Sequence, residues 1–331
     1  MRSPVIPPES QPAGLSASPS ASLSASLSVS PPVRLQNGRL ALEIADGDSL
    51  FTRFDRTGTV GQISLAGGGT FLTRESDPAG GPPGEKDGFG LACEFGLDGP
   101  VGWETPSQPL PEGRLFLKPG VGWLRADGAP YSFMKRYALE SPGTLTRSSG
   151  EGWLESCWDA GPAPSPAGGP GDLDCGYGCR YSRRIALEEE GLSIRCTFWN
   201  TGVLPFTLSE YCHNFLSLDG RPFPGDYRLR LLAGEGEPRW GSWDGLLRFE
   251  RYPGYRAFPA AEPAGEGAPD CRRIRGWELS WGGRSISEQV DFPVDRFALW
   301  SMAHVASPEL FVRFSLEPGC SFSWTRRYRI T

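Results

Sequence analysis

The sequence predicts an all-β protein built as one large antiparallel β-sandwich. Three observations lead to this fold class: short segments alternate apolar and polar residues, no segment keeps a helical apolar period beyond two turns, and glycine and proline are abundant. The 44 glycines and 32 prolines make up roughly a quarter of the 331 residues, about twice their average share. Both residues weaken helix interiors, so this composition excludes a helical bundle.

Alternation with a period of two marks the expected strands. Residues 192–198 and 227–231 place apolar side chains at every second position, and residues 322–328 do so at Phe322, Trp324 and Tyr328. This pattern is typical of antiparallel strands that bury one face. Residues 310–316 form a further expected strand, which ends at the turn sequence Glu317-Pro-Gly319.

Composition also suggests how the chain is divided. Residues 1–33 are rich in Ser, Ala and Pro and have no continuous apolar stretch, so we expect a disordered tail rather than a signal peptide. Residues 34–331 are expected to form a single sandwich domain. The Gly/Pro-rich stretch 159–178 is interpreted as a long surface loop between strands, and a linker between two domains stays open as the alternative.

Charge and cysteine content narrow the function classes. The net charge of -6 argues against a nucleic-acid-binding protein, which usually has a basic surface. No apolar run approaches the ~20 residues of a membrane helix. The eight cysteines, without a leader, favour a cytoplasmic protein with reduced thiols. Cys175 and Cys179 have a spacing found in zinc sites, but no second pair completes such a site, so no metal is expected.

His213 is the first candidate for proton transfer, because the chain has only two histidines. On a strand, Tyr211, His213 and Phe215 would share one face. Such a histidine lies either in a pocket or in the core, and both interpretations stay open. Glu309 is expected at the entry of the strand 310–316, where its carboxylate would project into a cleft or remain a solvated edge residue. His304 is expected in a loop or at a strand end.

The region around His213 resembles the galactose mutarotase (aldose 1-epimerase) superfamily. In residues 192–220, Asn200-Thr-Gly-Val-Leu-Pro205 leads into His213-Asn-Phe-Leu, as the family pattern does. The C-terminal order is similar too, with Phe297-Ala-Leu-Trp300, Ser307-Pro-Glu309, Leu316-Glu-Pro-Gly319 and Trp324-Thr-Arg-Arg-Tyr328. The resemblance implies the family's large antiparallel supersandwich. The sequence resembles uncharacterised bacterial mutarotase-like proteins more closely than it resembles true galactose mutarotase.

The resemblance implies roles for the two candidates. His213 would be the general acid and Glu309 the general base of an isomerase that interconverts sugar anomers without a cofactor. The two side chains would then flank one sugar ring. Lys118, in residues 116–122, stands where the family carries a further histidine, and a charged lysine can donate but not accept a hydrogen bond.

Further side chains are candidates for binding a small-molecule sugar, the expected partner. They lie beside aromatic residues or glycine turns: Arg53, Glu94, Lys118 and Asp226, with Trp300 as a stacking platform. The charged residues could equally be ordinary surface charges, and Trp300 a core residue. If His213 and Glu309 act together, Arg53 or Lys118 should lie in the same cleft.

Three functions remain open at this point. The first is a mutarotase-type enzyme of carbohydrate metabolism. The second is a non-catalytic sugar-binding protein on the same fold, suggested by the missing histidine. The third is a relative of polysaccharide lyases or glycosidases, although a lyase normally needs a helical toroid domain for which this chain has no room.

Overall fold

The computed structural model describes residues 32–45, 52–83, 87–101, 107–163, 176–223, 225–233, 246–247, 255–259 and 271–331. The expected tail at 1–33 therefore lies outside the described residues except for its last two positions. Cys175 and the central part of the stretch 159–178 also lie outside them.

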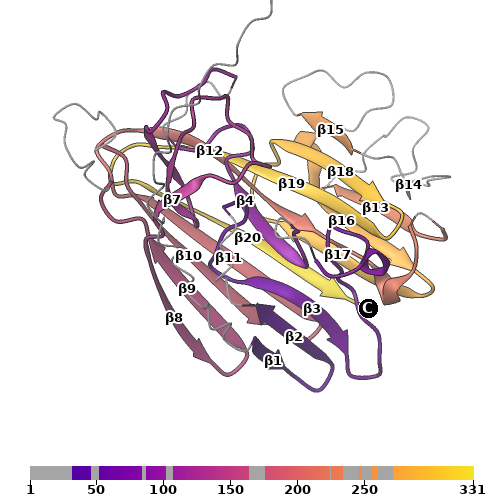
Figure 1. The fold of residues 1–331 in the computed structure, drawn as a ribbon. Helices are drawn as coiled ribbons and strands as arrows, with labels where there is room; N and C mark the ends of the chain where they lie inside the picture. Colours follow the sequence, from indigo (N-terminus) through magenta and orange to yellow (C-terminus); the bar gives the residue numbers. More distant parts are fainter. Residues whose placement is uncertain are drawn as a thin grey trace, which may run out of the picture.

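The described strands form two large antiparallel sheets and one small sheet (Figure 1). The eight-stranded sheet has the order β1 (Val33–Gln36), β2 (Leu40–Ala45), β3 (Thr59–Leu65), β4 (Leu91–Phe95), β12 (Phe206–Asn214), β19 (Val305–Leu316), β18 (Arg296–Met302) and β15 (Tyr255–Pro259). The nine-stranded sheet has the order β14 (Leu246–Leu247), β13 (Arg228–Ala233), β16 (Ile274–Trp281), β17 (Arg284–Val290), β20 (Ser321–Ile330), β11 (Gly191–Asn200), β10 (Cys179–Leu187), β9 (Trp153–Asp159) and β8 (Thr144–Gly150). The small sheet has the order β5 (Leu115–Lys118), β6 (Gly122–Arg125) and β7 (Ala138–Ser141).

The predicted fold class is confirmed. The helices whose bounds the structure describes are single 3₁₀ turns, Pro78–Gly80, Leu218–Gly220 and Cys271–Arg273, and no α-helix occurs among the described residues. Three of the expected strands correspond to β11, β13 and β20. The fourth is part of β19, but β19 begins at Val305, so the expectation that Glu309 lies at a strand entry is wrong. β9 and β10, which flank the stretch 159–178, pair directly in one sheet.

The main hydrophobic core lies between the two large sheets. Aromatic rings meet across it: Phe95 of β4 packs edge-on against Tyr181 of β10 at 5.0 Å, and Phe314 of β19 packs against Trp324 of β20 at 5.4 Å between centroids. Alternation of side chains along each strand sends every second residue into this core.

The other face of the eight-stranded sheet, which we call the outer face, carries the remaining side chains of β4, β12 and β19. These three strands are neighbours in the sheet. The small sheet approaches the outer face at β5, whose last residue, Lys118, contacts Glu94 of β4. The outer face therefore gathers polar side chains from elements that are far apart in the sequence.

The seven cysteines that the structure describes carry free thiols: Cys93, Cys157, Cys179, Cys196, Cys212, Cys271 and Cys320. In the described part of the chain, no group of three or more His, Cys, Asp or Glu residues is arranged to hold a metal ion. Among the same residues, no helix has the length and apolar character needed to cross a bilayer.

Candidate active site on the outer face

His213 and Glu309, 96 positions apart, are brought together by the pairing of β12 with β19. Tyr211 lies opposite Phe311 in this ladder, and the same register two residues further sets His213 opposite Glu309. Cross-strand neighbours on one face of a sheet are within side-chain contact distance. Accordingly, His213 Nδ1 lies 2.8 Å from Glu309 Oε1. Both residues are buried, with exposed fractions of 7% for His213 and 2% for Glu309.

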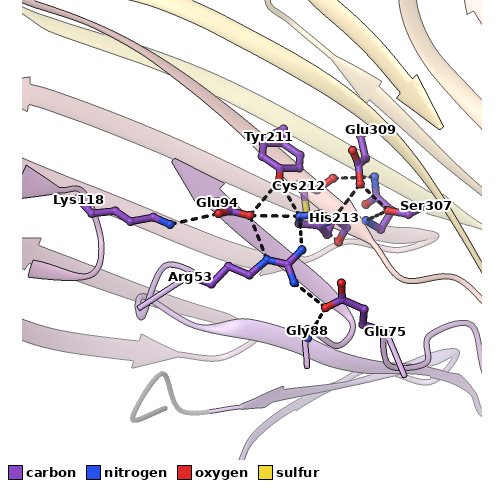
Figure 2. A network of polar contacts seen from close by, with 11 residues as sticks. Arg53, Glu75, Gly88, Glu94, Lys118, Tyr211, Cys212, His213, Ser307 and Glu309 are labelled. Atoms are coloured by element: carbon purple, nitrogen blue, oxygen red, sulfur yellow. Dashed lines mark hydrogen bonds and ion pairs between the residues drawn. The ribbon is translucent and has the colours of Figure 1, made fainter. Parts of the chain in front are cut away.

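The second ring nitrogen of His213 is also engaged (Figure 2). Nε2 lies 2.7 Å from the hydroxyl of Tyr211, which donates to Glu94 Oε2 at 2.9 Å. The same carboxylate oxygen lies 3.3 Å from His213 Nε2. Glu309, His213, Tyr211 and Glu94 therefore form a continuous row of groups that can hold or pass protons.

Two cations also contact Glu94 (Figure 2). Lys118 Nζ donates to Glu94 Oε1 at 3.1 Å, and Arg53 Nε lies 3.5 Å from Oε2. Arg53 also donates through Nη1 to Glu75 Oε2 at 2.7 Å, and the backbone N–H of Gly88 donates to the same oxygen at 3.0 Å. The cluster thus contains three basic side chains, counting His213, and three carboxyl groups.

The hydroxyl of Ser307 fixes the carboxylate of Glu309. Ser307 Oγ donates to Glu309 Oε1 at 2.9 Å and accepts the backbone N–H of Asn214 at 3.1 Å. Glu309 Oε1 therefore contacts both a hydroxyl donor and the imidazole.

Electrostatics favour a protonated His213. Burial opposes the charged form, but the carboxylates of Glu309 and Glu94 outweigh it and raise the pKa of His213 to about 9. Burial also opposes ionisation of Glu94, yet Lys118, His213 and Arg53 lower its pKa to about 2. Burial lowers the pKa of Lys118, and Glu94 partly offsets this effect. His213 can therefore act as a proton donor at neutral pH.

Aromatic rings line one side of His213. The ring of Phe215 is stacked on the imidazole at 5.1 Å between centroids, and Phe54 meets it edge-on at 5.5 Å. Trp300 packs edge-on against Phe215 at 6.0 Å. Phe54 and Trp300 are only partly buried, so this side faces the surface.

The structure brings together five of the seven side chains selected from the sequence: His213, Glu309, Arg53, Glu94 and Lys118. Trp300 lies one ring away from His213, against Phe215. Asp226 is exposed and lines a groove beside the β16–β17 turn, apart from this cluster. We expected His213 and Glu309 to lie far enough apart to flank a sugar ring. In this structure that expectation is wrong, because the two side chains are in direct contact.

Sequence reasoning missed three members of the cluster. The period-two spacing places Tyr211 on the same strand face as His213. It did not identify Tyr211 as the hydrogen-bond partner of His213, although two side chains so spaced on one face are neighbours. Ser307 lies two positions before Glu309 on β19, so the same spacing places its hydroxyl beside the Glu309 carboxylate. Glu75 lies in the loop between β3 and β4, and a loop has no side-chain periodicity from which its position could be predicted. The second histidine, His304, contacts the backbone oxygen of Glu75 through Nε2 at 2.9 Å, at the β18–β19 turn.

The raised pKa of His213 predicts a pH-dependent stability. Folded-state stabilisation from this group is complete below the unfolded pKa of about 6.5 and is lost as the pH rises through about 9. Between pH 6 and pH 10, this loss should be about 3 kcal/mol of unfolding free energy. Urea unfolding of the wild type and of His213→Gln at both pH values measures it. Equal pH dependence in the two proteins would contradict the ion pair.

Comparisons with known proteins support the fold. No family model matches the sequence, and no curated protein matches it. Similar solved structures include a galactose mutarotase-like protein from Clostridium acetobutylicum, with a TM-score of 0.54 and 13% identity over 90% of this chain and 94% of that one. The Slr1438 protein from Synechocystis has a TM-score of 0.52 and 12% identity, covering 92% of this chain and 98% of its own.

A candidate aldose 1-epimerase from Escherichia coli K12 is similar to the same degree. Its TM-score is 0.51 and its identity 13%, over 91% of this chain and 98% of that one. At such identities the likeness establishes the fold alone: the chain has the galactose mutarotase-like sandwich, as the sequence resemblance implied.

Proposed function

We propose that this protein binds an aldose and interconverts its anomers, with His213 as general acid and Glu309 as general base. The observation that carries the proposal is the contact between an imidazole of raised pKa and a buried carboxylate on the outer face. A protonated donor beside an acceptor is the pair that ring opening of a cyclic sugar needs. The fold shared with mutarotase-like proteins agrees with this function.

The reaction follows from proton transfer at two oxygens. Glu309 takes the proton of the anomeric hydroxyl while His213 protonates the ring oxygen, so the bond between C1 and the ring oxygen breaks and an open-chain aldehyde forms. After rotation about C1–C2, the oxygen of the hydroxyl released by ring opening attacks C1 from the other face and re-forms the ring bond. In this step His213 recovers its proton from that hydroxyl and Glu309 returns its proton to the aldehyde oxygen, which becomes the anomeric hydroxyl of the other anomer. Both groups end as they began, so the proposed reaction requires neither a cofactor nor an oxidant.

The direct contact sets a condition on binding. A sugar has to separate His213 from Glu309, which lie 2.8 Å apart. We propose that it enters from the side of Phe54 and Trp300, where side chains are partly exposed. Arg53 and Lys118 would then donate hydrogen bonds to sugar hydroxyls, in competition with Glu75 and Glu94.

Anomer exchange tests the proposal directly. We expect the protein to accelerate equilibration of at least one aldose among glucose, galactose and their 6-phosphates, followed by NMR exchange spectroscopy or polarimetry. Arg230→Ala serves as the control variant, because Arg230 is exposed and pairs only with Glu278 in the described structure. No acceleration with any aldose of a wider panel would refute the enzymatic function.

The second candidate function is sugar binding without catalysis. The observation that favours it is the closed contact between His213 and Glu309, which leaves no space for a ring between them. This candidate predicts thermal stabilisation by a sugar that the protein does not equilibrate. A scan of melting temperatures with the same sugars distinguishes the two.

A further inference from the structure

We infer that Asn214 is the positioning residue that holds Glu309 against His213, and that it does so from the opposing sheet through Tyr328 and Glu288. The inference rests on the proposed function only in giving Glu309 a catalytic role. The contacts that carry it lie behind the outer face, in the core between the two large sheets.

The β12–β19 ladder lacks one pair of backbone hydrogen bonds. Leu216 and Ala306 exchange both backbone hydrogen bonds, at 2.9 and 3.0 Å. In an antiparallel ladder such pairs recur at every second residue, so the next one is Asn214 with Pro308. Proline has no backbone N–H, so this pair cannot form as a normal rung. The gap falls beside His213 and Glu309.

Side-chain hydrogen bonds replace the missing backbone pair. Asn214 Nδ2 donates to the backbone oxygen of Pro308 at 2.6 Å. The backbone N–H of Asn214 donates to Ser307 Oγ, and Ser307 Oγ donates to Glu309 Oε1. Asn214 therefore holds residues 307–309 to β12 at the point where the backbone alone does not.

Contacts with the opposing sheet orient the Asn214 side-chain amide. Its Oδ1 accepts the hydroxyl of Tyr328 of β20 at 3.0 Å, and its Nδ2 lies 3.3 Å from Glu288 Oε2 of β17. An acceptor on one side and a donor on the other allow only one orientation of the amide. Glu288 is itself fixed by Trp277 Nε1 at 2.6 Å and by Arg326 Nη1 at 2.7 Å. The opposing sheet thus determines where Nδ2 points.

The consequence appears at His213. Loosening residues 307–309 weakens the contact of Glu309 with the imidazole, and this contact is the main reason that the imidazole stays protonated. The other titratable groups that face the ring are Glu94 of β4, Tyr211 of β12 and Arg53. None of them is bonded to Asn214, so they should keep their places when Asn214 changes.

Histidine NMR provides a readout that needs no sugar. The chain has two histidines, so a His213→Gln sample assigns both resonances. We expect His213 to titrate near 9 in the wild type and about one unit lower in Asn214→Ala, a tenfold loss of proton affinity. Tyr328→Phe, which removes a single hydroxyl, should move the same resonance in the same direction by a smaller amount.

Matched controls separate positioning from general loosening. Tyr227→Phe also removes the hydroxyl of a buried tyrosine, which bonds to Leu218 and Arg221 outside this network. It should leave the His213 titration unchanged. If Asn214→Ala does not fold, the His213 titration in Tyr328→Phe tests the inference alone, because this variant retains the buried aromatic ring. An unchanged His213 pKa in the folded variants, or an equal shift in Tyr227→Phe, overturns the inference.

The two proposals fail in different ways. A wild type that equilibrates no sugar refutes the enzymatic function but leaves the His213 titration interpretable. If the enzyme is active, Asn214→Ala should lower kcat about tenfold and move the pH profile, whereas a purely structural role would lower only the melting temperature. Wild-type activity with an unshifted titration in the variants refutes the positioning role and leaves the enzymatic function standing.

Discussion

His213→Gln and Glu309→Gln are each expected to lower the rate of anomer exchange by about 10²–10⁴-fold, the usual contribution of general acid–base catalysis. Glutamine retains much of the size of both side chains but cannot carry the proton. Because the two groups act on one sugar in the same step, the double variant should be little slower than either single variant. Anomer exchange measured at saturating sugar gives this comparison.

The controls for this expectation use sugar binding. Glu309→Gln should still bind the sugar, because an amide retains hydrogen-bonding capacity at that position. Arg230→Ala should retain full exchange activity, as an exposed residue outside the cluster. Full activity in either glutamine variant would exclude the proposed roles, whatever the fold.

Arg326→Met is expected to cause the largest loss of stability, about 3–5 kcal/mol of unfolding free energy. Arg326 is fully buried and donates to Glu288 Oε1 and Glu210 Oε2, both at 2.7 Å. Without the guanidinium, two buried carboxyl groups lose their common partner. Such a loss is a large fraction of the 5–15 kcal/mol typical of a folded protein. Urea unfolding at pH 7 measures it.

A surface pair gives the matched control for Arg326. Arg329, three residues along β20, pairs with Glu190 at 2.7 Å but has a side chain that is 65% exposed. Arg329→Met should cost less than about 1 kcal/mol. Adding Glu210→Gln and Glu288→Gln to Arg326→Met should recover part of the loss by removing the unpaired charges. An equal loss of unfolding free energy in Arg326→Met and Arg329→Met would show that the burial of Arg326, Glu210 and Glu288 is unimportant for stability.

Much of the fold could be predicted from the sequence because the alternation of apolar and polar residues along a strand is a local property. Residues 192–198 show it throughout and residues 322–328 show it except at Arg326, and they lie in β11 and β20. The start of β19 could not be predicted in the same way. Pro308 interrupts the strand pattern, and proline normally ends or borders a strand. Its tolerance here depends on Asn214, which lies 94 positions away and supplies the missing contact.

The site was only partly predictable, for a related reason. The family resemblance identified His213 and Glu309, but their distance depends on the register of β12 against β19, which no local pattern encodes. Arg53 and Lys118 come from a loop and from the small sheet, so their convergence on Glu94 is a property of the tertiary structure. Asp226 had the same local surroundings of glycine and aromatic residues, yet it lies at a different turn.

The cluster that contains His213 has three basic and three acidic groups, and this balance has a consequence for ligand selection. A cluster whose charges cancel projects little long-range field, so it neither attracts nor repels a ligand from a distance. The chain as a whole is negative, with a formal charge of -6, and this weakly disfavours the approach of anions. Under the proposed function, discrimination among sugars would therefore arise at short range, from the fit of individual hydroxyl groups, and we expect an uncharged sugar to be preferred over its phosphate.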